Sequence, residues 1–234
     1  MAKVALWHMD PVLCLLPSPL LGPVCWRPVA AALAADGWAV AEVPPAQAAP
    51  RTGAAALATL LAAIPEDRDA VLIPHSNAGL FVPSLAAARH RAVGYVFADA
   101  GLPAAGERVP MVPRQFYDVL AAKADIDGML PPWTQWWDGE DLSGLFSDAQ
   151  TRAQVESQQQ RLPLSYFAES VSVPAGWPER AGAYLAFGET YGPERAAAAA
   201  LGWPVTTLPG EHLHMLVNPA EVAAALIDLV AQIG

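Results

Sequence analysis

The feature that most constrains the fold is a regular alternation of short apolar runs with alanine-rich stretches of helical spacing, repeating about every 25 to 30 residues. The apolar runs expected as strands cover 12–16, 38–43, 70–73, 93–98, 183–187 and 205–208. The stretches expected as helices cover 24–35, 54–64, 77–89, 193–201 and 219–233. This alternation is typical of parallel strands joined by helical crossovers. We therefore predict an α/β fold with a mostly parallel central sheet flanked by helices.

The alternation breaks once, after Gly101. From residue 107 to 178 the sequence becomes rich in proline and tryptophan, with helical spacing near 115–123, 147–160 and 164–170. We therefore expect one core domain formed by residues 1–106 and 179–234, interrupted by a helical lid at 107–178.

The composition excludes several classes of protein. With 54% hydrophobic and 15% charged residues, the 234-residue chain can bury a real core, so it is not disordered. Its net charge of −10 opposes binding to nucleic acid or to an anionic membrane. Cys14 and Cys25 form neither a disulfide framework nor a metal-ligand spacing, and no metal is expected. The first residues lack a signal-peptide pattern, so we expect a cytoplasmic protein.

The most informative segment is the junction at Ser76, where an apolar run ends on His75-Ser76 and helical spacing begins at once. A serine between a strand and a helix presents its hydroxyl at the carboxyl edge of the sheet, and the N–H of the next residue, Asn77, points at the same space. The neighbours two positions away must be small, and they are Pro74 and Ala78. The alternative is that Ser76 only caps the following helix.

A nucleophilic serine needs a general base, and the loop after the last expected strand contains His212 and His214. We favour His212, because Gly210 and Glu211 keep it in the loop, whereas His214 lies closer to the last helix. Two carboxylates could orient that base. Asp99 closes the fourth expected strand, and Glu189 follows the fifth. We favour Asp99, because its short side chain at a strand end is well fixed.

With these residues in place, the sequence resembles the α/β-hydrolase superfamily, specifically its small bacterial members, over nearly its whole length. The similar segments are LLPSPLLGPVCWRPVAAALAADGWAVAEV, IPHSNAG, YVFADAGLP and GEHLHMLVNPAEVAAAL. IPHSNAG looks like the nucleophile elbow of these enzymes, and GEHLHMLVNPAEVAAAL looks like their histidine loop and final helix. The resemblance implies a triad of Ser76, Asp99 and His212, a lid over roughly 107–178, and no cofactor.

Three departures from the superfamily pattern matter. Pro74 and Ala78 replace the usual glycines of the elbow. Pro19 stands where a residue usually donates a backbone N–H to the oxyanion hole, and proline has none. Loss of one such donor typically costs about 3 to 4 kcal/mol of transition-state stabilisation, which leaves Asn77, with Leu20 as the candidate second donor. Finally, many members carry an aspartate where this chain has Thr190-Tyr191, which also favours Asp99 as the acid.

Residues of the expected lid supply a candidate substrate wall. Trp133, Trp136 and Trp137 fall within five residues and suit an apolar or aromatic ligand; alternatively, they pin the lid to the core. Tyr117 and His214 are further candidates for contact with the substrate.

These features favour a serine hydrolase acting on a small or medium apolar ester, lactone or thioester. One alternative is a cyclase, lyase or isomerase of secondary metabolism on the same fold, because Pro19 weakens the oxyanion hole. Another is a ligand-binding protein without catalysis, since fold alone does not fix function. The partner expected in each case is a small apolar or aromatic molecule, and the sequence leaves the oligomeric state open.

Overall fold

The computed structural model describes residues 11–45, 48–104, 106, 108–137, 142 and 144–234. Its centre is a six-stranded sheet, and every strand pairs with its neighbours in parallel. In spatial order the strands are β2 (Val40–Glu42), β1 (Val12–Leu16), β3 (Ala70–Ser76), β4 (Ala92–Ala100), β7 (Ala181–Phe187) and β8 (Val205–Leu208). The predicted α/β fold with a parallel central sheet is confirmed.

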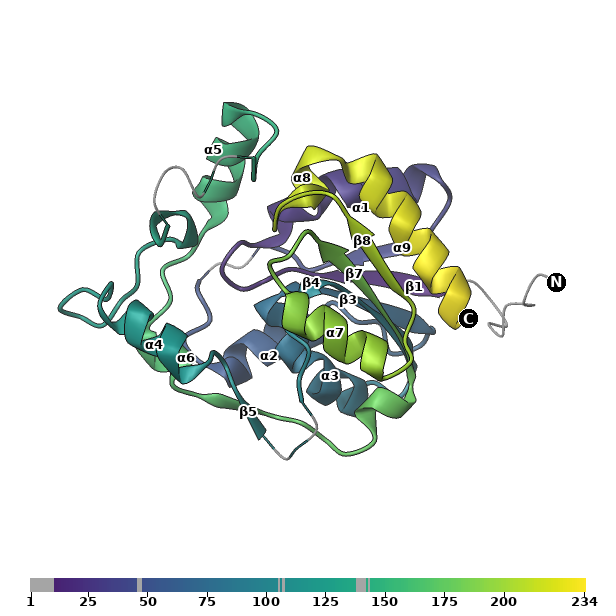
Figure 1. Cartoon of the computed structure of the whole chain (residues 1–234), viewed down its shortest axis with the longest axis horizontal. Coiled ribbons are helices and arrows are strands. Elements are labelled where there is room, and N and C mark those ends of the chain that lie inside the picture. The colour runs from purple at the N-terminus through teal and green to yellow at the C-terminus, as the bar shows by residue number, and fades with distance from the viewer. Residues whose placement is uncertain (1–10, 46–47, 105, 107, 138–141, 143) are drawn as a thin grey trace.

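Helices cover both faces of this sheet (Figure 1). On one face lie α1 (Arg27–Ala35), α8 (His214–Val217) and α9 (Pro219–Ile233). On the other lie α2 (Gly53–Ala62), α3 (Val82–Ala88) and α7 (Gly192–Ala200). Local sequence sets where these helices begin: the Thr52 hydroxyl accepts from the Ala55 N–H at α2, and Asn218 precedes Pro219 at α9. Helices therefore cover both faces of the sheet, and only the ends of the strands remain accessible for a functional site.

The two strands that carry the candidate residues are longer than the sequence predicts. β3 continues past residue 73 to Ser76, and β4 continues past residue 98 to Ala100. The last residues of both strands include polar side chains, so a search for apolar runs ends each strand too early. These polar side chains are nevertheless buried in the structure. Ser76 and Asp99 thus lie within strand ends rather than in the loops after them.

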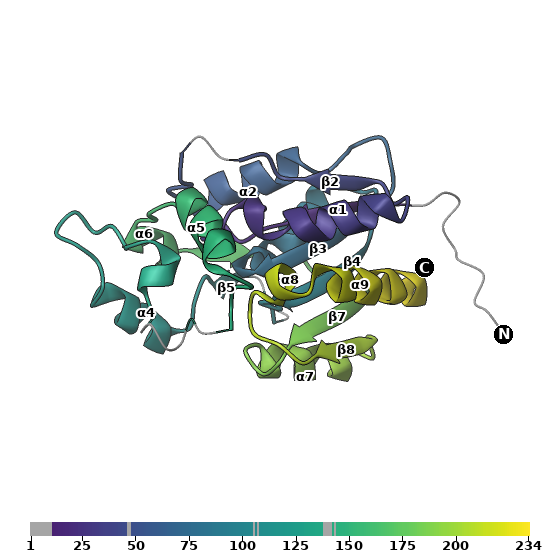
Figure 2. The ribbon, with the colours of Figure 1, turned by 90° about the horizontal axis from the view of Figure 1, so that it is seen from above.

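The residues between β4 and β7 form a separate group of short elements. They are β5 (Arg108–Pro110), α4 (Arg114–Ala121), η3 (Trp133–Gln135), α5 (Ala149–Gln158), α6 (Leu164–Phe167), β6 (Ser170–Ser172) and η5 (Trp177–Glu179). The three predicted helical pieces correspond to α4, α5 and α6. The antiparallel β5–β6 pair was not predicted, because each strand has only three residues and its partner is far away in sequence. Figures 1 and 2 show α4, α5 and α6 beyond one end of the sheet, opposite the end where the chain termini lie.

Two sequence expectations fall on parts of the chain outside the described residues: the boundary at residue 107 and the interpretation of residues 1–10. Within the described ranges, no helix combines the length and the apolar character that crossing a bilayer requires.

Candidate active site

Ser76 has the backbone of a sharp strand-to-helix turn. Its φ is 57° and its ψ is −132°, a region that residues with a side chain rarely adopt. The chain continues directly into the 3-10 helix η2 (Asn77–Phe81). Gly79 allows this turn to approach the next strand, since a Cβ there would lie 2.1 Å from the carbonyl oxygen of Gly101. The Ser76 side chain makes no capping hydrogen bond, so the helix-cap alternative is wrong.

Asp99 is the second residue with an unusual backbone, with a φ of 44°. Its carboxyl group is fully buried, and Oδ1 accepts a hydrogen bond from the Phe187 N–H at 3.1 Å. The Tyr184 hydroxyl braces the next residue by donating to the Ala100 carbonyl oxygen at 2.7 Å, while the Ala100 N–H donates to it at 3.1 Å. β4 thus ends in a fixed bend that directs the Asp99 carboxylate across the strand ends.

His212 lies in the loop after β8, and its ring meets that carboxylate. The distance between His212 Nδ1 and Asp99 Oδ2 is 2.6 Å, and the histidine side chain is nearly buried. A carboxylate only accepts, so Nδ1 carries the proton in this bond and Nε2 is left available as a base. This is the geometry in which a carboxylate orients a catalytic imidazole.

His75, the residue before Ser76, contacts the loop that contains His212. Its Nε2 lies 2.9 Å from the backbone carbonyl oxygen of His212, and the two imidazole rings stack with centroids 4.5 Å apart. Burial, and then the neighbouring His212, lower the pKa of His75 well below its usual value, so this ring is neutral. Sequence reasoning treated His75 only as part of the elbow motif, because nothing in the sequence shows which loop a strand-end ring touches.

A cavity of about 650 Å³ opens in front of these residues, within the size range of small-molecule sites. Ser76 and His212 both line it. The other lining residues include apolar and aromatic side chains from both the core and the segment between β4 and β7: Leu20, Leu80, Met111, Val112, Phe116, Trp133, Trp136, Trp137, Leu145 and Phe167. A smaller cavity of about 190 Å³ is lined by Ser18, Pro19 and Gln158 and contains none of the candidate catalytic side chains.

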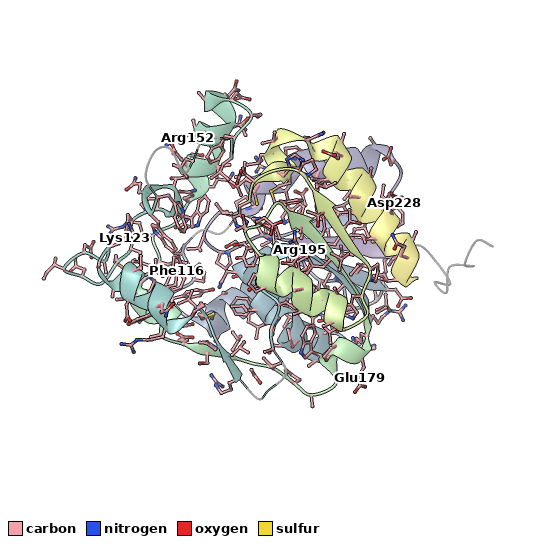
Figure 3. All side chains as sticks on the ribbon, in the orientation of Figure 1. Phe116, Lys123, Arg152, Glu179, Arg195 and Asp228 are labelled. Atoms are coloured by element: carbon pink, nitrogen blue, oxygen red, sulfur yellow. The ribbon has the colours of Figure 1, made fainter. Side chains whose placement is uncertain are left out.

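The three tryptophans occupy different positions in this wall. The Trp133 ring lies 6.0 Å from that of His212. The Trp136 Nε1–H donates to the Pro131 carbonyl oxygen at 2.8 Å, and its ring is almost completely buried. Trp137 is more exposed and stacks on Phe116 at 6.0 Å; Figure 3 labels Phe116 on α4. The Trp136 ring packs against Phe116 and Phe167, so its contacts lie within the segment 107–178 rather than on the core. All three tryptophans line the cavity, and their role as a substrate wall stays a prediction.

The structure does not bring three of the predicted candidates into the cavity. His214 begins α8 and is held by Glu221, with 3.1 Å between Nε2 and the carboxylate. Tyr117 lies one position beyond the lining residue Phe116 on α4, and its ring contacts Arg114 instead. Glu189 is exposed and forms an ion pair with Arg195, which excludes it as the partner of His212 in this structure.

The candidate oxyanion donors both line the cavity. The side chain of Asn77 is fixed on both sides, because its Oδ1 accepts from the Tyr166 hydroxyl at 2.8 Å and its Nδ2 donates to the Met111 carbonyl oxygen at 3.3 Å. The Leu20 N–H donates to Ser18 Oγ at 3.3 Å, a long bond that a better acceptor could replace.

Tyr191 is the residue that sequence reasoning missed. Its hydroxyl lies 3.4 Å from Ser76 Oγ, and its ring lies 5.5 Å from the ring of His212. Between the described side chains of Ser76 and His212 there is no direct hydrogen bond, and apo sites often lack this contact. The available signal was the Thr190-Tyr191 pair, which departs from the aspartate that the resemblance implies at this position.

The charged residues at the cavity are all acidic. Glu194 and Glu211 line it, and none of the lining residues that the structure describes is a lysine or an arginine. Partial burial, with the nearby Asp99 carboxylate, raises the pKa of Glu194 above its usual value. In the described part of the chain, no group of three or more His, Cys, Asp or Glu side chains is arranged to hold a metal ion.

Comparison with known proteins identifies the fold. No family model matches the sequence, and no curated protein matches it significantly. Solved structures do match: polyneuridine aldehyde esterase at 18% identity, covering 94% of this chain and 99% of that one, with a TM-score of 0.70. An extracellular α/β-hydrolase from a Paenibacillus species matches at 17% identity over 96% and 99%, with a TM-score of 0.72. Tomato Methylketone Synthase I in complex with 2-tridecanone matches at 12% identity over 97% and 100%, with a TM-score of 0.69. The chain has the α/β-hydrolase fold.

Proposed function

We propose that this chain of α/β-hydrolase fold is a serine hydrolase that acts on small to medium, largely apolar esters, lactones or thioesters. One observation carries the proposal: His212 Nδ1 lies 2.6 Å from the buried carboxylate of Asp99, and its ring lines the same cavity as Ser76. The positive φ of Ser76 adds support, because backbone strain of this kind is found where function requires it. Solved structures of the same fold include proteins named as esterases and hydrolases.

In this mechanism Ser76 Oγ attacks the substrate carbonyl carbon and His212 Nε2 takes the serine proton. Asp99 holds the imidazole in the Nδ1–H tautomer and stabilises the imidazolium that forms. The imidazolium then protonates the leaving group, and an acyl group remains on Ser76. Water, activated by the same imidazole, releases the acid.

The oxyanion is bound in this proposal by the backbone N–H groups of Asn77 and Leu20. Pro19 removes the donor usual at its position, and Leu20 follows it in the same turn and lines the cavity. The developing negative charge is a stronger acceptor than the Ser18 hydroxyl, so the Leu20 N–H exchanges one for the other as the reaction proceeds.

The segment at 107–178 acts in this proposal as a lid that shapes the substrate site. Phe116, Trp133, Trp137 and Leu145 come from it and form an apolar wall opposite Ser76. Such a wall favours an apolar or aromatic acyl or alcohol group. A large polar substrate would leave its hydrogen-bonding groups unpaired against this surface.

The test is the intact mass of the protein after treatment with a fluorophosphonate, compared between wild type and Ser76→Ala. The proposal expects one adduct on the wild type and none on the variant, followed by turnover of apolar esters in a screen of esters, lactones and thioesters. A folded wild type that gains no adduct would refute a working serine nucleophile.

A second candidate is a non-hydrolytic reaction, such as that of a cyclase, lyase or isomerase, in the same cavity. Two observations favour it: Pro19 lacks the usual N–H donor, and the Ser76 hydroxyl is paired with Tyr191 rather than with His212. One similar fold is also named a synthase. Here His212 would act as acid and base, and Ser76 as a hydrogen-bond donor. His212→Ala separates both reactions from simple ligand binding, because either enzyme would lose its catalytic rate, whereas a binding protein would keep its affinity and has no rate to lose.

A further inference from the structure

Tyr191 places an oxygen beside the candidate nucleophile, and the mechanism above does not use it. The distance between its hydroxyl and Ser76 Oγ is 3.4 Å, and the tyrosine ring lines the cavity. After Ser76 attacks an ester, the leaving-group oxygen is only two bonds away from Oγ. A group within hydrogen-bond distance of Oγ is therefore positioned to reach the oxygens of the intermediate.

The backbone around Tyr191 is held in place by Arg195, which Figure 3 labels on α7. The Arg195 guanidinium donates to the Gly188 carbonyl oxygen at 3.2 Å and pairs with Glu189. The backbone N–H of Arg195 donates to the Tyr191 carbonyl oxygen at 2.9 Å. These bonds close the turn between β7 and α7. The hydroxyl is thus presented by a fixed loop, as a group that acts on a transition state must be.

The order of the strands defines the side of Ser76 on which Tyr191 lies. β1, which leads to the candidate oxyanion donor Leu20, flanks β3 on one side. β7 and β8, which lead to Tyr191 and His212, lie on the other side. The Tyr191 and His212 rings are 5.5 Å apart. Tyr191 therefore belongs to the flank from which the base delivers its proton, away from the oxyanion donor.

We infer that Tyr191 is a catalytic residue whose hydroxyl donates a hydrogen bond to the leaving-group oxygen of the substrate. The inference rests on the proposed hydrolase function. When the intermediate collapses, the bond between carbon and the leaving oxygen breaks, and its electron pair moves onto that oxygen. His212 transfers the proton to it, while Tyr191 keeps its own proton and stabilises the developing charge through the hydrogen bond.

Two properties of the hydroxyl suit this role. Burial raises the pKa of Tyr191, so the phenol stays protonated at neutral pH and can donate. In the resting site the hydroxyl is paired with Ser76, so it is not left unsatisfied before substrate binds. When the intermediate forms, the Tyr191 hydroxyl changes its hydrogen-bond partner from Ser76 Oγ to the leaving-group oxygen, which is two bonds away from Oγ.

The experiment measures kcat/KM of wild type and Tyr191→Phe on esters of one acyl group whose alcohols differ in pKa, from nitrophenol to a simple alkyl alcohol. A poor leaving group needs stabilisation and a nitrophenolate does not. The expected result is a loss of about 10- to 100-fold on the alkyl ester, with less than about a 2-fold loss on the nitrophenyl ester. The rate would then depend more steeply on leaving-group pKa in the variant. Tyr117→Phe, at a tyrosine outside the cavity, is the matched control and should change neither.

An equal loss on all esters, or no loss on the alkyl ester, would overturn the inference in favour of a packing role. Fluorophosphonate labelling separates this failure from failure of the proposed function. Tyr191→Phe should still be labelled at Ser76, because the fluoride leaving group needs no help. If the wild type itself is not labelled, the hydrolase proposal fails, and the role of Tyr191 in leaving-group departure fails with it.

Discussion

His75 and His212 are joined through a backbone oxygen and through their rings. Nε2 of His75 donates to the His212 carbonyl oxygen at 2.9 Å, and the stacked rings are 4.5 Å apart. A carbonyl oxygen only accepts, so the bond requires the Nε2–H tautomer of His75. The residue before the candidate nucleophile therefore fixes the loop of the candidate base.

This contact predicts a stability that depends on pH. The pKa of His75 is lowered in the folded chain, whereas in the unfolded chain it is near 6.5. Below about pH 6.5 the unfolded state therefore binds a proton that the folded state refuses, and stability falls by up to about 1.4 kcal/mol per pH unit. His75→Gln keeps an N–H donor but does not titrate, so its free energy of unfolding should fall less as the pH decreases.

Urea unfolding of both proteins at a series of pH values between about 5 and 7.5 measures this difference. His90→Gln, at an exposed histidine, is the control and should follow the wild type. Parallel curves for wild type and His75→Gln would contradict the prediction.

The pairing of His212 with Asp99 predicts a specific loss of activity. Asp99→Asn keeps the shape and the bond to the Phe187 N–H, but an amide favours the wrong tautomer of the imidazole. We expect kcat to fall by about 10³- to 10⁴-fold with little change in the folded fraction. Glu189→Gln should keep nearly full activity, because that side chain is exposed and paired with Arg195. Steady-state kinetics on one apolar ester would compare the variants, and a larger loss in Glu189→Gln would reverse the assignment.

The sequence predicts the core well because the central strands β1, β3, β4 and β7 are almost completely buried and contain continuous apolar runs. β1 and β8 have the predicted bounds, and α9 also begins and ends as predicted. The positions of Ser76, Asp99 and His212 could be inferred because each follows or ends an expected strand, and parallel strands bring their carboxyl ends to one edge. These three assignments of role remain proposals.

What could not be predicted depends on directions of side chains and on contacts distant in sequence. Tyr117 and Phe116 are neighbours on one helix, and spacing alone did not reveal which of them lines the cavity. His214 and His212 are two residues apart, yet a turn directs the first to Glu221. The hydroxyl of Tyr191 meets Ser76 across 115 positions of sequence, which no local pattern encodes.

The strained backbone of Ser76 predicts a difference in stability between two inactive variants. At φ 57° a residue with a Cβ is strained, whereas glycine adopts this region readily. Ser76→Gly and Ser76→Ala should both be inactive, but the glycine variant should be more stable than the alanine variant by about 1 kcal/mol. Denaturant unfolding measures the difference. An alanine variant at least as stable as the glycine variant would show that the turn carries no such strain.

The tryptophans of the cavity wall predict a separation between binding and stability. Trp137 is 37% exposed, so Trp137→Ala should raise KM for bulky apolar esters several-fold while the free energy of unfolding changes by less than about 1 kcal/mol. Trp136 is 4% exposed and hydrogen-bonded, so Trp136→Ala should cost about 3 to 5 kcal/mol. Unfolding curves and KM values of both variants provide the comparison. The interpretation fails if Trp137→Ala is the more destabilised of the two.

The acidic residues at the cavity predict discrimination by substrate charge. Glu194 and Glu211 line it without a lysine or arginine among its described lining residues, so a carboxylate on the substrate is repelled. Of two nitrophenyl esters of equal length, one ending in a methyl group and one in a carboxylate, the charged ester should have a kcat/KM about 10-fold lower or more. Added salt should reduce this difference in kcat/KM between the two esters.

The raised pKa of Glu194 predicts a dependence on pH, because its carboxylate becomes neutral at a higher pH than an ordinary glutamate does. The difference in kcat/KM should therefore also decrease as the pH is lowered. Glu194→Gln should reduce the discrimination at neutral pH, whereas Glu189→Gln, outside the cavity, should not. Equal discrimination in wild type and Glu194→Gln would mean that the apolar wall, and not this carboxylate, rejects the charged ester.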